Sequence, residues 1–177
     1  MGFYGLNMAS FSVSVIIPTL DRISLLEKAL ISVFSQTLPV NEIIVVDNGS
    51  SDGTQKMLSL SFPNVIAISE KKKGVSFARN AGILIAKSDW IAFLDSDDEW
   101  MPKKMEKQAE AYFHSDRKSR LIHTNELWFR QKKIVNHLPK KFVIEVWVYG
   151  VRLYHSRHRD MIAEKVERMI AHSSEEP

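Results

Sequence analysis

The chain has 177 residues, of which 45% are hydrophobic and 25% charged, and its formal net charge is +3. This is the composition of one ordinary globular domain, and it excludes a disordered, a collagen-like and a multi-domain chain. Cysteine is absent, which excludes disulfides, a thiol nucleophile and zinc–thiolate sites and favours a reducing compartment.

Basic residues are concentrated in the second part of the chain. Residues 1–100 contain 8 Lys and Arg against 11 Asp and Glu, whereas residues 101–177 contain 16 against 10. A basic surface can attract diphosphates, anionic lipid or nucleic acid, but this imbalance is small, and we interpret it as a solvated surface without a nucleic-acid partner. No apolar run approaches the ~18 to 20 residues of a membrane-spanning helix. We therefore expect a cytoplasmic protein, with peripheral association at the cytoplasmic face of a membrane as the alternative.

Short apolar runs alternate with helical patterns over the first two thirds of the chain. Strands are predicted at Val13–Ile17, Ile43–Val46, Val65–Ile68 and Ile91–Leu94, and helices at Arg22–Ser35, 52–60, Val75–Ala86 and Lys103–Phe113. Strands that are apolar on both faces and alternate with helices indicate a parallel sheet covered on each side. The predicted fold class is therefore α/β.

Beyond Ser119 the pattern changes. Antiparallel strands are predicted at Leu121–Phe129 and Phe142–Tyr149, with a short one at Ile134–Val135. An apolar stripe from Met161 to Ile170 predicts a C-terminal helix that packs on the sheet or on a partner subunit, and contact with a membrane surface is the alternative. We divide the chain into a domain of residues 1–136 and a divergent C-terminal extension of residues 137–177.

Polar and acidic residues follow three of the predicted strands. Thr19, Leu20, Asp21 and Arg22 come after the first strand, and Asp47 comes after the second. Ligands of open parallel sheets bind at the carboxyl ends of the strands. The alternative interpretation is that Asp21, and Asp52 in the next loop, only form turns and cap helices.

The segment Asp95–Asp98 carries three carboxylates directly after the fourth strand. Such charges repel one another, and we expect a cation to neutralise them. Residues two apart in an extended segment point the same way, so Asp95 and Asp97 can face one site. Hard oxygen ligands of this kind suit Mg²⁺ or Mn²⁺ held together with substrate phosphates. The cation would act as a Lewis acid that stabilises a diphosphate leaving group.

Four segments together resemble the signature segments of family 2 glycosyltransferases of the GT-A fold. They are Val15–Leu20, Ile43–Thr54, Gly74–Gly82 and Ile91–Trp100, and their order and spacing match over roughly residues 12–136. The resemblance implies a Rossmann-like, mostly parallel sheet with antiparallel additions in the C-terminal part. It also implies an inverting, metal-dependent transferase of the kind that builds cell-envelope polysaccharides. The donor is a nucleotide-diphosphate sugar, and the acceptor is a carbohydrate, a lipid-linked sugar or a protein.

Residue roles follow from the same resemblance. The implied nucleotide-binding residues are Pro18, Thr19 and Asp21 in the nucleoside pocket, Asp47 on the base, Arg79 on the base or the phosphates, and Asp95 on the ribose or sugar. Asp97 is the implied metal ligand, with Asp95 supporting it. The alternatives are that Arg79 only pairs with a carboxylate and that Gly74 and Gly82 serve only backbone geometry.

The general base is not found in this pattern. Family members continue into an acceptor-binding half that supplies an acidic base, often a Glu-Asp pair, and no such pair occurs in residues 101–177. Glu126 and Glu145 are weak candidates. His155 and His158 lie among arginines, and we interpret them as a cationic surface rather than as metal ligands. The competing functions are a truncated or non-catalytic nucleotide-sugar-binding domain and a phosphohydrolase with Asp95 as nucleophile.

Overall fold

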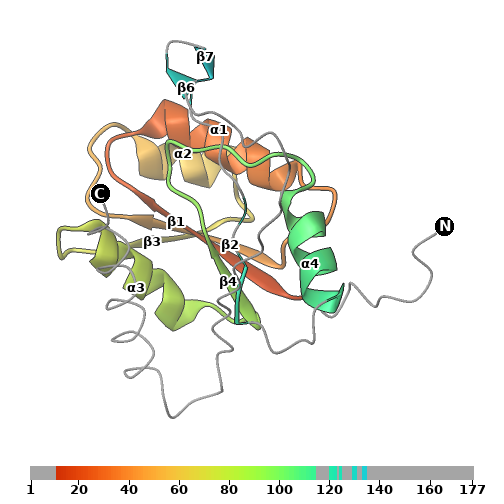
Figure 1. Cartoon of the computed structure of the whole chain (residues 1–177). Helices are drawn as coiled ribbons and strands as arrows, with labels where there is room; N and C mark the ends of the chain where they lie inside the picture. The colour runs from red at the N-terminus through yellow and green to blue at the C-terminus, as the bar shows by residue number, and fades with distance from the viewer. Residues whose placement is uncertain (1–10, 115–119, 123, 125–128, 131–132, 135–177) are drawn as a thin grey trace, which may run out of the picture.

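A four-stranded parallel sheet forms the centre of the molecule, and helices cover its faces (Figure 1). The computed structural model describes residues 11–114, 120–122, 124, 129–130 and 133–134. The strands are β1 (Val13–Thr19), β2 (Glu42–Asp47), β3 (Ile66–Ser69) and β4 (Trp90–Phe93), in the order β3-β2-β1-β4. The helices are α1 (Ile23–Phe34), α2 (Thr54–Ser61), α3 (Val75–Ile85) and α4 (Lys104–His114). The predicted α/β class is confirmed.

The central strand β1 is buried along its whole length, because it pairs with β2 on one side and β4 on the other. Its aliphatic side chains alternate between two hydrophobic clusters, with Val15 and Ile17 in one and Ile16 in the other. Strand β3 is an outermost strand of the sheet, and its Ile66 is 37% exposed. The prediction of a strand covered on both faces is wrong for β3, because α3 packs over β1 and β2 instead.

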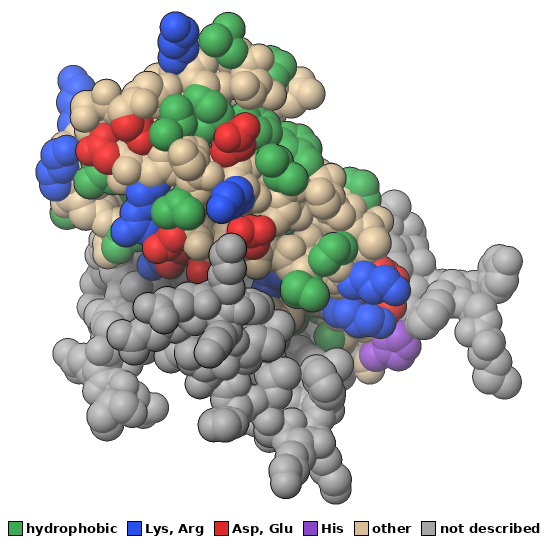
Figure 2. Space-filling view, turned by 90° about the horizontal axis from the view of Figure 1, so that it is seen from above, with side chains coloured by type: hydrophobic (Ala, Val, Ile, Leu, Met, Phe, Trp, Pro, Cys, Tyr) green, Lys and Arg blue, Asp and Glu red, His purple; other side chains and the backbone are tan. Residues whose placement is uncertain are grey.

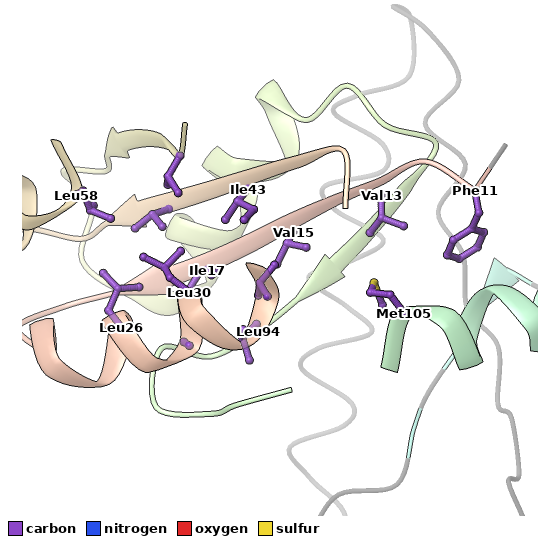
Figure 3. Packing of buried hydrophobic residues seen from close by; sticks show 14 of the residues in the cluster. Phe11, Val13, Val15, Ile17, Leu26, Leu30, Ile43, Leu58, Leu94 and Met105 are labelled. Carbon is purple, nitrogen blue, oxygen red and sulfur yellow. The ribbon is translucent and has the colours of Figure 1, made fainter. Parts of the chain in front are cut away.

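The two faces of the sheet have separate cores. Three helices pack on one face, where Leu26 and Leu30 of α1, Leu58 of α2 and Met105 of α4 meet the aliphatic residues of β1 and β2 (Figure 3). The core of the other face is smaller and joins the sheet to α3 through Ile16, Ile44, Val46, Ala78 and Ile83. Helix α3 therefore packs on the sheet through a small set of buried aliphatic side chains.

Helix α3 lies close against β1 at Gly82. A Cβ added at Gly82 would lie 2.5 Å from Cγ2 of Ile16, well inside the ~3.5 to 4.0 Å at which two carbon atoms attract each other. Ile16 is fully buried, so it has little space to move. The glycine therefore permits the close approach of helix and strand, and Arg79 projects from α3 about one turn before it.

We expect the substitution Gly82→Ala to lower the free energy of unfolding. Overpacking costs about 1–3 kcal/mol, and the 2.5 Å approach to a fully buried residue places Gly82→Ala in the upper part of this range, at about 2–3 kcal/mol. The better helix propensity of alanine returns about 1 kcal/mol. The net loss should be about 1–2 kcal/mol, measured by urea unfolding followed by circular dichroism. Leu60→Ala on α2 is the control, because Leu60 is 72% exposed and should change stability by less than about 0.5 kcal/mol. A Gly82→Ala chain as stable as the wild type would contradict the close packing.

The described residues beyond α4 form short strands, β5 (Arg120–Leu121), β6 (Phe129–Arg130) and β7 (Lys133–Ile134). Strands β6 and β7 pair antiparallel, which confirms an antiparallel addition around Ile134. The prediction of one continuous strand over Leu121–Phe129 is wrong, because Ile122 and Thr124 lie outside any strand.

Contacts with α4 explain that interruption. The backbone carbonyl of Ile122 accepts a hydrogen bond from Nε2 of Gln108 at 3.2 Å, and Oγ1 of Thr124 accepts one from Nζ of Lys104 at 2.6 Å. Both bonds hold the segment along the helix rather than in a strand pairing. The predicted elements at Phe142–Tyr149 and Met161–Ile170 lie outside the described residues. Within the part of the chain that the structure describes, no helix has the length and hydropathy needed to cross a membrane.

Candidate functional site

The carboxyl ends of β1, β2 and β4 lie at one edge of the sheet, because these strands are parallel and adjacent. At this edge Thr19 is the register partner of Asp47. Pro18 and both of these residues are buried. Oγ1 of Thr19 has no hydrogen-bond partner among the described residues, although burying a hydroxyl without one costs free energy. The end of β1 therefore has an unused hydrogen-bonding group.

The loops after β1 and β2 are joined by hydrogen bonds through Asp21. The backbone N–H of Asp21 donates to Oγ of Ser50 at 2.9 Å, and the backbone N–H of Ser51 donates to Oδ1 of Asp21 at 2.6 Å. The hydroxyl of Ser51 lies 3.2 Å from the same oxygen. Asp21 has a φ of 50°, a left-handed conformation that aspartate tolerates better than most residues. Its observed contacts are those of a loop residue that ties two strand ends together.

The carboxylate of Asp52 accepts hydrogen bonds from the first backbone N–H of two helices. Its Oδ2 accepts from Ile23 at the start of α1 at 2.9 Å, and its Oδ1 accepts from the N–H and hydroxyl of Thr54 at the start of α2. The N-cap residues themselves are Arg22 and Gly53. Asp52 nevertheless accepts the first N–H of both α1 and α2, which supports its interpretation as a residue that closes helix ends. Hydrogen bonds from Thr54 and Ile23 lower the pKa of the Asp52 carboxyl, because they stabilise its charged form.

The carboxylate of Asp47 accepts hydrogen bonds from the loop that follows it and from the first turn of α2. Oδ1 accepts from the backbone N–H of Gly49 at 3.2 Å and of Ser50 at 2.8 Å, and Oδ2 accepts from Nε2 of Gln55 at 2.7 Å. Burial acts to raise the pKa of Asp47, but the bonds from Ser50, Gln55 and Gly49 outweigh it and lower the pKa. Asp47 is therefore a structural centre of the loop as well as the residue implied to bind the base.

These two lowered pKa values predict a loss of stability in acid. A carboxyl whose pKa is lower in the folded chain stabilises it above its ordinary pKa of 3.8, and this contribution disappears as the pH falls through that value to the folded pKa. We expect the free energy of unfolding to decrease between about pH 5 and about pH 3. Urea unfolding across this range would measure it, and Asp47→Asn and Asp52→Asn should each flatten the decline. Equal slopes in all three chains would refute this origin.

Asn48 holds the loop between β3 and α3 against the end of β2. Its Nδ2 donates to the backbone carbonyls of Glu70 at 2.9 Å and Lys72 at 2.7 Å, and its Oδ1 accepts the N–H of Gly74 at 2.7 Å. Gly74 has a φ of +128°, which other residues rarely adopt. No role in holding the loop between β3 and α3 was predicted for Asn48 from the sequence.

Three consecutive lysines, Lys71–Lys73, lie beside this loop and are exposed. Two of their side chains nevertheless have contacts within the chain. Nζ of Lys73 donates to the backbone carbonyl of Asn48 at 3.1 Å, and Nζ of Lys72 lies 5.4 Å from the centre of the Phe77 ring. These contacts fit a structural role for the two lysines beside the loop.

Arg79 on α3 forms an ion pair with Asp95 after β4. Nη2 of Arg79 lies 2.7 Å from Oδ1 of Asp95, and the Arg79 side chain is only 16% exposed. Its guanidinium carbon lies 5.6 Å from the centre of the Phe93 ring. The Nε of Arg79 is buried without a hydrogen-bond partner among the described residues. The carboxylate-pairing alternative for Arg79 is thus observed, and one donor of the guanidinium remains for a ligand.

Arg22 forms the corresponding ion pair with Asp97. Nη1 of Arg22 lies 2.6 Å from Oδ2 of Asp97, and the two side chains are 48% and 47% exposed. Arg22 follows Asp21 at the end of β1, so this pair connects the first loop of the edge to the loop after β4. Arg22 was expected to follow the first strand, but no functional role was predicted for it.

The two ion pairs supply part of the charge balance that was expected from a bound cation, because Arg79 and Arg22 lie against Asp95 and Asp97. Across the described ranges, no three His, Asp or Glu side chains form a cluster that could hold a metal ion. A site with two carboxylates still fits Mg²⁺ or Mn²⁺, since these ions commonly take one or two carboxylates and complete their coordination with phosphates and water. The metal role of Asp97 stays a prediction.

Acidic and basic side chains are intermixed on the face drawn in Figure 2. A nucleic-acid-binding domain usually concentrates Lys and Arg on one face or along one helix. The described residues on this face do not have that pattern. The candidate bases Glu126 and Glu145, and the histidines His155 and His158, lie outside the described residues.

Comparison with known proteins identifies the family. The sequence model described as "Glycosyl transferase family 2" matches residues 14–168. The chain belongs to this family. The match extends beyond Asn136, where the resemblance of the four segments ends, and the proposed division of this family 2 chain at residue 136 stays a prediction.

Curated relatives match a little over half of this family 2 chain. It is 37% identical over 103 residues to the "Putative teichuronic acid biosynthesis glycosyltransferase TuaG" of Bacillus subtilis, covering 55% of the chain and 40% of TuaG. It is also 37% identical over 103 residues to the "UDP-Glc:alpha-D-GlcNAc-diphosphoundecaprenol beta-1,3-glucosyltransferase WfgD" of Escherichia coli, covering 57% of the chain and 41% of WfgD. The aligned part thus spans less than half the length of these relatives.

A solved structure of TarS residues 1–349 from S. aureus, in complex with UDP, has the same fold. It superposes with a TM-score of 0.56 and 26% identity, covering 64% of this family 2 chain and 36% of TarS. The parallel sheet with helices on both faces is therefore a GT-A-like domain.

Proposed function

We propose that this chain binds a nucleotide-diphosphate sugar and takes part in transferring its sugar, with inversion, to an acceptor hydroxyl. The observation that carries the proposal is the convergence of the loops after β1, β2 and β4 at one sheet edge, joined through Asp21, Arg22 and Asp97. The loops after β2 and β4 belong to segments that resemble the family signatures, and the loop after β1 directly follows such a segment. TarS residues 1–349, 26% identical, was solved in complex with UDP, which supports a nucleotide as the ligand of this chain.

The buried groups at this edge suit a nucleotide. A nucleoside beside Pro18 and Asp21 could supply the hydrogen bond that the Thr19 hydroxyl does not have among the described residues. Asp47 keeps acceptor capacity on Oδ2, which receives one hydrogen bond, and a carboxylate oxygen can accept more than one. We propose that this oxygen accepts a ring N–H of the base, and that Arg79 offers its buried Nε to the nucleotide.

A divalent cation would be held by Asp97, with Asp95 supporting it. When bound, the cation neutralises charge on the departing diphosphate. The chain's own contribution is to hold two carboxylates and the buried Arg79 guanidinium in position around the phosphates, which reduces the reorganisation needed in the transition state. Mg²⁺ and Mn²⁺ both fit an all-oxygen site of this kind.

The acceptor is proposed from the relatives. WfgD is named for transfer to a diphosphoundecaprenol-linked sugar, and TuaG for teichuronic acid biosynthesis. We propose an acceptor of this envelope class, a lipid-linked sugar or a growing polysaccharide, which would bring the chain to the cytoplasmic face of a membrane. A carboxylate outside the described residues, such as Glu126 or Glu145, would act as the general base that deprotonates the acceptor hydroxyl.

Calorimetric titration of the full chain with UDP, GDP and their sugar conjugates tests the proposal. With Mn²⁺ or Mg²⁺ present, at least one nucleotide should bind, and chelation of the metal should weaken that binding. A folded sample that binds none of them would refute the proposal. If binding occurs without transfer to any lipid-linked or polysaccharide acceptor, the chain is a nucleotide-sugar-binding domain. The phosphohydrolase alternative is disfavoured by the family, and a covalent aspartyl-phosphate on Asp95 would restore it.

A further inference from the structure

We propose that Arg22 changes partner when the donor binds. Its guanidinium holds Asp97 in the chain alone and moves to the diphosphate when a divalent cation takes that carboxylate. This inference rests on the proposed function and adds a residue that neither the four segments nor the comparisons point to. Arg22 would thereby couple metal binding to nucleotide binding.

The two arginines of the edge differ in how firmly they are held. Arg79 projects from a helix, is 16% exposed and lies against Phe93. Arg22 lies in the loop before α1, its side chain is 48% exposed, and its guanidinium forms an ion pair with Asp97. An exposed ion pair of this kind changes an equilibrium constant by only about two- to fivefold, so a ligand can displace it. Of the two ion pairs, the one at Asp97 is therefore the exchangeable one.

A divalent cation and the Arg22 guanidinium compete for the same carboxylate. Mg²⁺ or Mn²⁺ binds oxygen at about 2.1 Å, and Nη1 of Arg22 lies 2.6 Å from Oδ2 of Asp97. If both bound this oxygen, a dication and a guanidinium nitrogen would lie within about 5 Å of each other. Like charges at that distance repel. Since the Arg22 side chain is half exposed, it can rotate away while the metal stays.

The diphosphate is the natural new partner for the released side chain. A guanidinium binds phosphate oxygens through two parallel N–H donors, a stronger interaction than a neutral hydrogen bond. The backbone of Arg22 is held in place, because its carbonyl accepts the N–H groups of Leu25 and Leu26 at the start of α1. The neighbouring Asp21 is fixed by Ser50 and Ser51. Only the side chain has to change its rotamer.

The substitution Arg22→Ala separates this role from a structural one, because it should move two affinities in opposite directions. Mn²⁺ alone, followed by the electron paramagnetic resonance signal of the free ion, should bind the variant about two- to fivefold more tightly, since its competitor is gone. UDP or GDP, whichever binds the wild type, should bind about tenfold more weakly at saturating Mn²⁺, since a charge-assisted hydrogen bond to phosphate is lost. Arg22→Lys should recover part of the nucleotide affinity.

Lys28→Ala is the matched control. Lys28 is an exposed residue on α1, and its removal changes the net charge by the same amount about 9 Å further along the helix. Both affinities should stay at the wild-type values. Weaker or unchanged Mn²⁺ binding by Arg22→Ala, or unchanged nucleotide binding, would overturn the partner exchange while the proposed function stands. A wild-type chain that binds no nucleotide with Mn²⁺ would instead overturn the proposed function, and this inference with it.

Discussion

Replacing Asp47 by alanine is expected to lower the free energy of unfolding by about 3 kcal/mol. The change leaves the backbone N–H groups of Gly49 and Ser50 and the amide of Gln55 without the acceptor they now share, and each such donor costs about 1–3 kcal/mol when it is buried, less when it can reach water. Asp47 is 3% exposed, so water can replace the lost acceptor only in part. Urea unfolding at pH 7 would measure the effect.

Asp47→Asn separates the structural role from the binding role. The asparagine keeps one oxygen for the two backbone donors, and its amide can donate to Gln55 if the Gln55 amide turns over, so stability should change by less than about 1 kcal/mol. A ring N–H of a base would meet an amide N–H instead of an oxygen. Nucleotide affinity should therefore fall at least about tenfold. Unchanged affinity in a stable Asp47→Asn chain would remove Asp47 from the base-binding site.

Replacing Asp97 by alanine is expected to abolish the metal-dependent part of nucleotide affinity. Loss of a charged ligand to the cation should weaken UDP or GDP binding about 10- to 100-fold in Mn²⁺. In the presence of a chelator the variant should bind the nucleotide at least as tightly as the wild type, since removal of Asp97 also releases Arg22 for the diphosphate. Stability should fall by no more than about 1 kcal/mol, because the Arg22–Asp97 pair is half exposed.

Glu99→Ala is the control for charge in the same loop. Glu99 is exposed, and its removal changes the net charge by the same amount two residues further along. It should keep the wild-type response to Mn²⁺. If Glu99→Ala and Asp97→Ala weakened binding equally, the effect would come from the general charge of the loop rather than from one metal ligand.

Much of the α/β fold was predictable because its signals are local. Helix α1 was predicted at Arg22–Ser35 and occupies Ile23–Phe34, since its apolar residues recur at helical spacing. Strand β1 was predicted to end before Pro18 but continues to Thr19. The carbonyl of Ile16 accepts from Leu94 on the β4 side, so the nitrogen of Pro18, two residues later, faces that same side. There the pairing with β4 has already ended at Phe93, and the missing N–H costs no hydrogen bond.

The partners of the site residues could not be predicted, because they depend on which loops meet. Arg22 and Asp97 are far apart in the sequence and come together only because β4 pairs with β1 rather than with β3. The resemblance implied Asp47, Asp95 and Asp97 but contained no information about Asn48 and Gln55, which hold the loops. The polar residues after each predicted strand identify the carboxyl ends of the strands as the site. Which side chains pair across these loops depends on the three-dimensional arrangement of the strands.

The shared use of Asp52 by two helices also limits how the site can move. Because Asp52 lies in the loop after β2 and accepts the first N–H of α1, the loops after β1 and β2 cannot separate without removing this hydrogen bond from α1. The loop after β4 is joined to the loop after β1 by the Arg22–Asp97 pair, which is half exposed. Such a pair contributes little free energy, so a ligand separates these two loops more easily than the first two.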